Sequence, residues 1–378
     1  MGIIFHENTK EFHLCNKEIS YIFCIMQNGQ PGQLYYGKRL RDRESFIHLF
    51  EEGVHDMAPC PYEGNNVFSL EYLKQEYPTY GTGDMRYPAF QIEQEDGSKI
   101  TEFTYKSHRI FQGKPTLKGL PAVYVEHDDE AVTLELILSD KIIQTDLILS
   151  YTVFENYPVI CRNARFEHYG DKKIVLGSAM SFNLDLPDSN YDMVDLTGAW
   201  ARERYVKCHR LHEGVQSIYS MRGHSSHQFN PFFALKRPEA NEDSGEALGF
   251  SLVYSGNFLG LVNTDTFDIS RVMMGIHPNE FAWTLRKGEV FQTPEAVLVY
   301  SEKGLNGMSQ TFHELYRTRL ARGYWRDRER PVLINSWEAM FMDFDEEKVL
   351  KLAKEAAALD IELFVLDDGW FGHRDDAT

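Results

Sequence analysis

The stretch Val132-Thr133-Leu134-Glu135-Leu136-Ile137-Leu138 is typical of most of this chain. Apolar residues occupy alternate positions with one lapse at Ile137, which is the period of a strand that buries one face. Residues 147–153, 162–166 and 174–184 show similar patterns, and turn-forming clusters such as Glu95-Asp96-Gly97 separate the segments. The sequence therefore predicts an all-β sandwich or barrel from residue 1 to about 325, built as one large pair of sheets or as two sandwiches.

Two long segments interrupt this pattern. Residues 39–90 are rich in turn-forming residues, and residues 200–231 are polar and rich in histidine. We expect both to be long connections, which are often functional when ordered, although each could equally be an ordinary surface excursion. Trp200 is expected in a polar loop of the second segment. Its ring either forms one wall of a ligand site (a ligand wall) or fills a gap in the core (a hydrophobic plug).

The pattern changes near residue 305. Helical spacing predicts a helix over 310–322 ended by Gly323, and a charged linker follows at 326–330. An apolar strand at 331–337, a helix opened by a capping box of Asp343 and Glu346, and a strand at 362–366 then predict a parallel βαβ unit. Parallel strands need cover on both faces, and a (β/α)8 barrel needs about 250 residues. We therefore expect the chain to be truncated inside a second domain, the alternative being a small unit completed by a partner.

Two adjacent acids, Asp367 and Asp368, follow the last apolar strand. The carboxyl ends of parallel strands face the ligand crevice in α/β folds, and carboxylates form strong hydrogen bonds with hydroxyl groups. Trp337 is expected to end the preceding strand on the same side. An aromatic ring and an acid pair would then lie at the same opening of the ligand crevice. The alternative is a solvated Asp-Gly turn.

Charge and composition exclude several classes of protein. The 378 residues include 39 basic and 57 acidic side chains, for a net charge of −18, which disfavours nucleic acid and anionic membranes as partners. Five scattered cysteines do not form a disulfide framework, and the absence of a signal-peptide pattern or long apolar run predicts a cytoplasmic protein. The spacing of His209, His212, His224 and His227 does not indicate a metal site, and no nucleotide-binding motif occurs, so no metal or cofactor is expected.

Five segments together resemble bacterial α-galactosidases of glycoside hydrolase family 36. They are Gln75-Glu76-Tyr77-Pro78, Gly198-Ala199-Trp200-Ala201-Arg202-Glu203-Arg204, Ser225-Ser226-His227-Gln228-Phe229-Asn230-Pro231-Phe232, Ile334-Asn335-Ser336-Trp337-Glu338-Ala339 and Leu366-Asp367-Asp368-Gly369-Trp370-Phe371-Gly372. The resemblance implies a β-supersandwich with a linking helix at 1–325 and the incomplete start of a (β/α)8 TIM barrel at 326–378. It also implies that the full-length protein is a homotetramer that hydrolyses terminal α-D-galactose of melibiose, raffinose and stachyose by a retaining mechanism.

The resemblance also implies roles for four residues. Asp367 and Asp368 match acids that hold the galactose hydroxyls, Trp337 matches a tryptophan lining the galactose pocket, and Trp200 matches a tryptophan near the substrate. A sugar-contacting acid of some members aligns near Gly53 to His55, where this chain has no carboxylate. The family's nucleophile and acid/base lie on later barrel strands, so no catalytic residue is assigned and the chain alone is expected to be inactive.

Two other classes of function remain open from the sequence. One is a non-catalytic carbohydrate-binding or assembly module made mainly of the sandwich. The other keeps the fold but transfers galactosyl groups or prefers N-acetylgalactosamine.

Overall fold

The structure, a computed structural model, describes residues 2–54 and 61–372. It divides into two compact units, residues 1–320 and 321–378, each with its own sheet structure. None of the described helices is long and apolar enough to cross a membrane.

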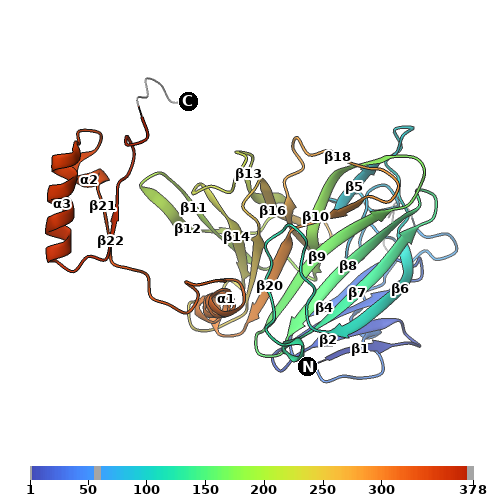
Figure 1. The fold of residues 1–378 in the computed structure, drawn as a ribbon. Helices are drawn as coiled ribbons and strands as arrows, with labels where there is room; N and C mark the ends of the chain where they lie inside the picture. Colours follow the sequence, from blue (N-terminus) through green and yellow to red (C-terminus); the bar gives the residue numbers. More distant parts are fainter. Residues whose placement is uncertain (1, 55–60, 373–378) are drawn as a thin grey trace. The chain divides into compact units, whose positions relative to one another are not determined.

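Antiparallel strands build the first unit (Figure 1). They are β1 (Gly2–His6), β2 (Glu11–Cys15), β3 (Ile19–Ile25), β4 (Pro31–Lys38), β5 (Phe90–Glu93), β6 (Thr104–Gln112), β7 (Ala131–Asp140), β8 (Thr145–Phe154), β9 (Val159–His168), β10 (Ile174–Leu186), β11 (Asp192–Ala199), β12 (Arg202–Arg210), β13 (Gly214–Ser220), β14 (Phe229–Lys236), β15 (Ala247–Val253), β16 (Phe258–Thr264), β17 (Ser270–Ile276), β18 (Trp283–Leu285), β19 (Val290–Gln292) and β20 (Glu295–Ser301). The strands expected at 132–138, 147–153, 162–166 and 174–184 are confirmed as β7 to β10.

These strands form three sheets. The four-stranded sheet has the order β1-β2-β3-β4, and the six-stranded sheet has the order β13-β16-β17-β10-β18 with β5 paired to β10. The ten-stranded sheet has the order β12-β11-β14-β15-β20-β9-β8-β7-β6, with β19 paired to β9. The mostly-β fold predicted from the alternating pattern is therefore confirmed.

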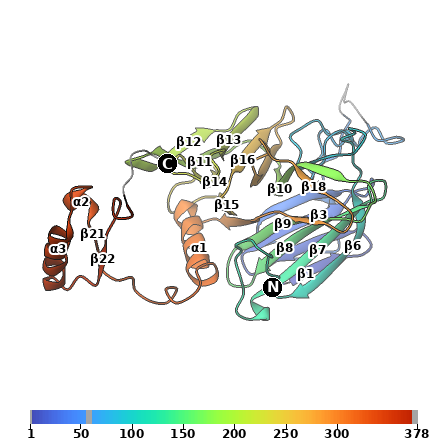
Figure 2. The ribbon, with the colours of Figure 1, turned by 45° about the horizontal axis from the view of Figure 1, so that its top comes forward.

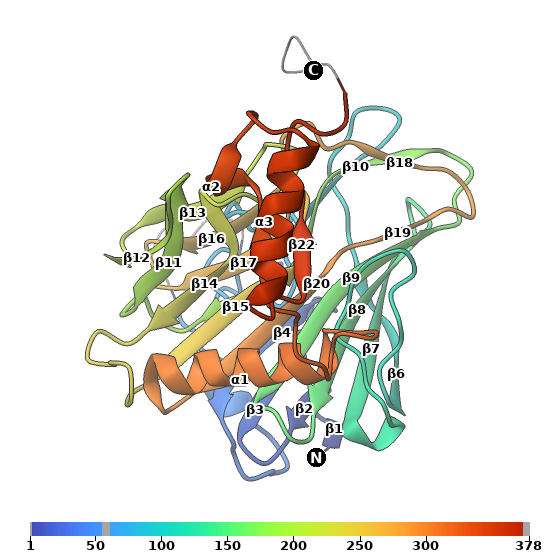
Figure 3. The same ribbon diagram turned by 60° about the vertical axis from the view of Figure 1, so that its left-hand side comes forward.

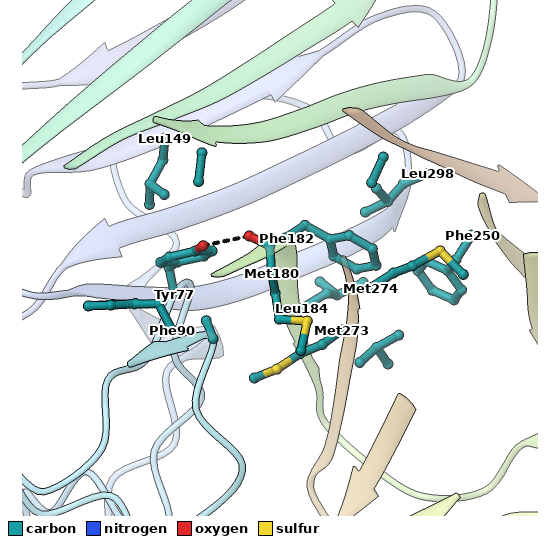
Figure 4. Close-up of a cluster of buried hydrophobic side chains, with 14 of the residues drawn as sticks. Tyr77, Phe90, Leu149, Met180, Phe182, Leu184, Phe250, Met273, Met274 and Leu298 are labelled. Atoms are coloured by element: carbon teal, nitrogen blue, oxygen red, sulfur yellow. Dashed lines mark hydrogen bonds between the residues drawn. The ribbon is translucent and has the colours of Figure 1, made fainter. Parts of the chain in front are cut away.

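The apolar side chains of the three sheets meet in one main core. Figure 2 shows the four-stranded sheet against β7 to β9, where the rings of Phe23 and Tyr151 stack with centroids 5.2 Å apart. A second part of this core surrounds Phe182 and Phe250, and the Tyr77 hydroxyl donates to the Met180 carbonyl at 2.5 Å (Figure 4). The period of two in β7 and β8 is the direct signature of this one-sided burial.

Buried charges tie the long segment at 39–89 to the sheets. Glu76 pairs with Arg162 of β9 at 2.8 Å, and Asp84 pairs with Arg271 of β17 at 2.8 Å. All four side chains are 1% exposed or less. The described part of the segment contains one short helix, η1 (Ile47–Leu49), with isolated bridges and turns, as its composition predicts. Residues 55–60, including Pro59 and Cys60, lie outside the described residues.

The expectation of a long connection at 200–231 is wrong. Most of this segment forms β12, β13 and the start of β14, and β11 pairs with β12 from Asp192↔Arg210 to Ala199↔Arg202. All nine residues of β12 are exposed, so neither face carries the alternating apolar residues by which a strand is recognised. The strand is specified by backbone pairing rather than by burial.

A helix, α1 (Gly304–Arg319), follows β20 and lies across β15 and β20 (Figure 3). The expected range was 310–322. The helix begins six residues before the start of that range and ends three residues before its end. Gly304 and Met308 are buried together with Phe312 and Leu315, so the apolar stripe extends further toward the N-terminus than the aromatic spacing indicated.

The second unit contains β21 (Leu333–Asn335), α2 (Trp337–Met340), α3 (Glu346–Ala358) and β22 (Leu363–Val365). Leu333↔Leu363 to Asn335↔Val365 pair in parallel, which confirms the βαβ unit. The predicted capping box is two residues out of place, because Asp345 and not Asp343 accepts from the Lys348 backbone N–H, at 2.8 Å. The compact unit extends from Ala321, and both the domain boundary at 326 and the identity of this unit as the start of a barrel stay predictions.

Candidate functional site

The parallel strands β21 and β22 end on the same edge of their small sheet. Because Asn335 pairs with Val365, residues 335–337 and 366–368 leave the sheet side by side. The Ser336 backbone N–H donates to the Val365 carbonyl at 3.0 Å, and the Asp367 backbone N–H donates to the Ser336 hydroxyl at 3.1 Å. Buried Ser336 therefore continues the strand pairing and places Asp367 at this edge.

Asp367 acts as a cross-link between the two strand ends. One carboxylate oxygen, Oδ2, accepts from the Asn335 side-chain amide at 2.6 Å. The other, Oδ1, accepts from the Asp368 backbone N–H at 2.7 Å. Each oxygen has a second lone pair. The carboxylate is thus fixed in direction and still able to accept a further hydrogen bond.

Asp368 lies at the tip of the turn that Asp367 orients, and it is half-buried. Its Oδ1 accepts from the Gly369 backbone N–H at 2.8 Å. Gly369 has a φ of +93°, a conformation that favours glycine, and a Cβ there would lie 2.7 Å from the Met342 sulfur. The turn that carries Asp368 therefore lies close to the loop after α2.

Trp337 is positioned by the same asparagine. Its backbone N–H donates to Asn335 Oδ1 at 2.8 Å, and its half-buried ring meets Phe341 edge-on with centroids 5.4 Å apart. Trp337 begins α2 and does not end the strand, which closes at Asn335, so that detail of the prediction is wrong. The structure nevertheless joins the Trp337 backbone to Asp367 through one side chain.

Sequence reasoning missed Asn335 and Ser336. Both polar residues end an otherwise apolar run, directly before Trp337. Polar side chains at the carboxyl end of a predicted parallel strand are a signal of a ligand crevice, and this signal could have identified them.

Trp200 belongs to the first unit. It lies in the tight turn between β11 and β12 and is 85% exposed. Gly198 permits the turn, because a Cβ there would come within 2.3 Å of the Arg202 carbonyl oxygen. The turn does not bury Trp200 as a plug within this unit, so the ligand-wall interpretation stays a prediction.

The described ranges 2–54 and 61–372 contain no group of three or more His, Cys, Asp or Glu side chains able to hold a metal ion. His209, one of the histidines considered from the sequence, lies 3.7 Å from Asp195 in an exposed strand. The region Gly53 to His55 ends outside the described residues.

Comparisons with known proteins agree with this architecture. The family model described as "Glycosyl hydrolase family 36 N-terminal domain" matches residues 29–286, and the model described as "Melibiase" matches residues 290–378. The mostly-β first unit and the acid-bearing βαβ unit are thus those of a glycoside hydrolase. This chain belongs to glycoside hydrolase family 36.

Several characterised members are similar over nearly the whole chain. Alpha-galactosidase AgaA of Geobacillus stearothermophilus is 51% identical over 100% of this chain, and Mel36A of Lactobacillus acidophilus is 41% identical over 99%. The crystal structure of AgaB from G. stearothermophilus superposes with a TM-score of 0.94 at 52% identity, covering 100% of this chain and 51% of that one. Variants of AgaA have been solved with raffinose and with stachyose. The chain spans 51% of the length of both AgaA and Mel36A.

Proposed function

We propose that this chain supplies the N-terminal β-domain and the first βαβ unit of the (β/α)8 catalytic barrel of a retaining α-galactosidase. The observation that carries this proposal is the acid pair at the carboxyl edge of β21 and β22, held by Asn335. Family membership and the similarity to alpha-galactosidases over nearly the whole chain support it.

In this proposal the two acids hold the hydroxyl groups of a terminal α-D-galactose. One oxygen of Asp367 joins the strand ends through Asn335 and the other accepts from the Asp368 backbone N–H, so its main role is to anchor the site while accepting one further bond. Asp368, at the turn tip, is the principal hydroxyl acceptor, and Trp337 packs against an apolar face of the sugar. A site that accepts bonds from particular hydroxyls disfavours an epimer, because its polar groups then lose their partners.

Asp367 and Asp368 are not the catalytic pair in this proposal. A retaining glycosidase needs two carboxyl groups about 5–5.5 Å apart on opposite sides of the scissile bond. Successive side chains at a strand end point in different directions, so neighbouring acids do not flank a substrate. The nucleophile and the acid/base are therefore proposed to lie in the half of the family's length that this chain does not span, and these acids would form and break a covalent galactosyl intermediate.

The proposed substrates are melibiose, raffinose and stachyose. The raffinose and stachyose complexes of AgaA variants support oligosaccharides of this class. A homotetramer of the full-length protein, its cytoplasmic location and sugar contact by Trp200 stay predictions.

The test is the Asp368→Ala substitution in the full-length enzyme. We expect kcat/KM for p-nitrophenyl α-galactoside to fall roughly 100-fold or more, because transition-state hydrogen bonds to the sugar are lost. Glu347→Ala, an exposed acid on α3, is the control and should leave kcat/KM unchanged. A fall of less than threefold for Asp368→Ala would show that the pair is only a structural turn.

The 378-residue chain itself gives a second test. It should release no p-nitrophenol, because both catalytic acids are proposed to lie in the half of the family's length that this chain does not span. Measurable turnover by the purified chain would contradict the proposed location of the catalytic acids.

A further inference from the structure

The first unit contains a cavity of about 510 Å³ far along the chain from the acid pair. It is bordered by the turn between β2 and β3, the end of β4, the turn between β8 and β9, the end of β20 and one side of α1. Its volume lies within the range of about 300–1,000 Å³ that is usual for small-ligand sites.

The walls of this cavity are cross-linked to one another. The buried Asn16 side-chain amide donates to the carbonyls of Phe154 and Tyr157, each at 2.7 Å, and so joins the β2–β3 turn to the β8–β9 turn. The Tyr157 hydroxyl lies 3.0 Å from Thr318 Oγ1, which fixes the Tyr157 ring against α1. Because these elements are already held together, a ligand would not have to order the walls, and little binding energy would be lost.

Gly307 brings α1 to the edge of the cavity. A Cβ at this position would lie 2.5 Å from Ser301 Oγ and 2.6 Å from Lys303 Cβ, so a larger residue would push the first turn of the helix away. The close approach leaves the polar side chains of Gln310, Thr311 and Glu314 along one wall.

The charges around the cavity nearly cancel. The basic lining residues are Lys17, Lys38, Arg39 and Lys303, and the acidic ones are Glu18, Glu302 and Glu314. Lys38 pairs with Glu302 at 3.0 Å, and Lys17 pairs with Glu155, beside the cavity, at 3.1 Å. A phosphate or another strong anion would therefore meet an excess of at most one positive charge in the lining.

The uncharged lining suits a ligand with many hydroxyl groups. The side-chain amides of Asn156 and Gln310 both donate and accept hydrogen bonds. Tyr157 is half-buried and Tyr300 is only 7% exposed, so their rings add a small apolar surface to the lining. Interleaved donors and acceptors beside a small apolar surface, with little net charge, match the hydroxyl groups and C–H surface of a pyranose. We propose that this cavity is a binding site for a short neutral saccharide, a role that does not depend on the proposed catalytic function.

The test is saturation-transfer difference NMR with the intact 378-residue chain and raffinose as the probe. We expect a dissociation constant on the order of 1 mM. The double variant Gln310→Leu with Glu314→Leu removes hydrogen-bonding groups from the wall without touching the core, and it should weaken binding about fivefold or more.

The matched control is His313→Leu with Arg317→Leu. Both side chains are exposed on the same helix and do not line the cavity, and each double variant breaks the exposed pair between Glu314 and Arg317. The control variant should bind raffinose as the unmodified chain does.

A third variant, Asp368→Asn, separates this inference from the proposed function. If the cavity binds the sugar, this variant keeps the signal. The inference is overturned if Asp368→Asn alone abolishes binding, if both helix variants behave alike, if raffinose gives no signal, or if inorganic phosphate binds in place of raffinose.

Discussion

Two groups of carboxylates in this chain, one around Glu76 and one formed by Asp367 and Asp368, accept similar hydrogen bonds but have different roles. Glu76, in the core of the first unit, is wholly buried and accepts from the hydroxyls of Tyr21 and Tyr151 at 2.6 and 2.9 Å while pairing with Arg162. Burial raises the pKa of Glu76 to about 7, although Arg162 and both tyrosines favour its ionised form. Asp367 and Asp368 instead lie half-buried at a strand edge, where the Asn335 amide and the Asp368 backbone N–H hold Asp367 and the Gly369 backbone N–H donates to Asp368.

The difference separates a structural acid from a candidate ligand-binding acid. A carboxylate that is fully buried against arginine has no access to a ligand, and its partners serve to compensate its burial. A carboxylate that is fixed in direction by neutral donors keeps both its charge and an accessible oxygen. Asp84 and Asp185 are structural acids of the same kind as Glu76, because both pair with buried Arg271, at 2.8 and 2.9 Å.

The largest stability effect is expected at the buried pair. Arg162→Met should lower the free energy of unfolding by about 3–5 kcal/mol, because Glu76 then loses its buried counter-charge. Urea unfolding at pH 7, followed by circular dichroism, measures this change. The exposed pair of Arg317 and Glu314 is the control, and Arg317→Met should cost less than about 0.5 kcal/mol. Equal effects at the two arginines would refute the structural role given to Glu76.

A smaller effect is expected at the strand edge. Asn335→Ala removes the amide that donates to Asp367 and the oxygen that accepts from the Trp337 backbone N–H. We expect a loss of about 2 kcal/mol in local stability. Amide hydrogen exchange at Trp337 and Asp368 should quicken, while exchange in β7 and β8 of the first unit should not change. Unchanged exchange at Trp337 would mean that Asn335 does not organise the site.

The smallest effect concerns pH at His13 in β2. Its Nε2 lies 3.2 Å from Arg39 Nη1. Because a guanidinium can only donate, Nε2 accepts this hydrogen bond, and the neutral imidazole fits the site. Burial lowers the pKa of His13, while its hydrogen bond to Asp42 opposes the shift. The folded state therefore binds this proton less readily than the unfolded state does. The stabilisation is complete above about pH 6.5 and is lost as the pH falls through the lowered value.

The dependence can be isolated with His13→Gln. Between pH 7.5 and 5.5, the unmodified chain should lose up to about 1.4 kcal/mol per pH unit more unfolding free energy than the variant. Urea midpoints at several pH values measure the difference. Parallel pH profiles for the two proteins would contradict the assignment.

Much of the fold was predictable because its signals are local. Leu134, Leu136 and Leu138 alternate along β7, and their burial in the core follows from that period. The parallel pairing of β21 and β22 was likewise predictable from an apolar strand, a helix and a second apolar strand. The position of the acid pair at the carboxyl edge followed directly from that unit.

The predictions of secondary structure were wrong where the local sequence pattern does not reflect which residues are buried. β12 is exposed on both faces, so its sequence resembles a loop although β11 pairs with it along most of its length. Helix α1 begins at Gly304, and its first turn approaches Ser301 at Gly307, a close contact that no helical spacing rule contains.

The sequence by itself determined the alternation of buried and exposed residues, the βαβ unit and the acids at its edge, because these depend on neighbours within a few positions. Only the tertiary structure decided which groups pair across long separations, such as Glu76 with Arg162 and Asn335 with Asp367. Such pairs form when distant strands are brought together by the packing of their apolar faces. Hydrogen bonds and ion pairs are then selected by distance in space, which the order of residues does not state.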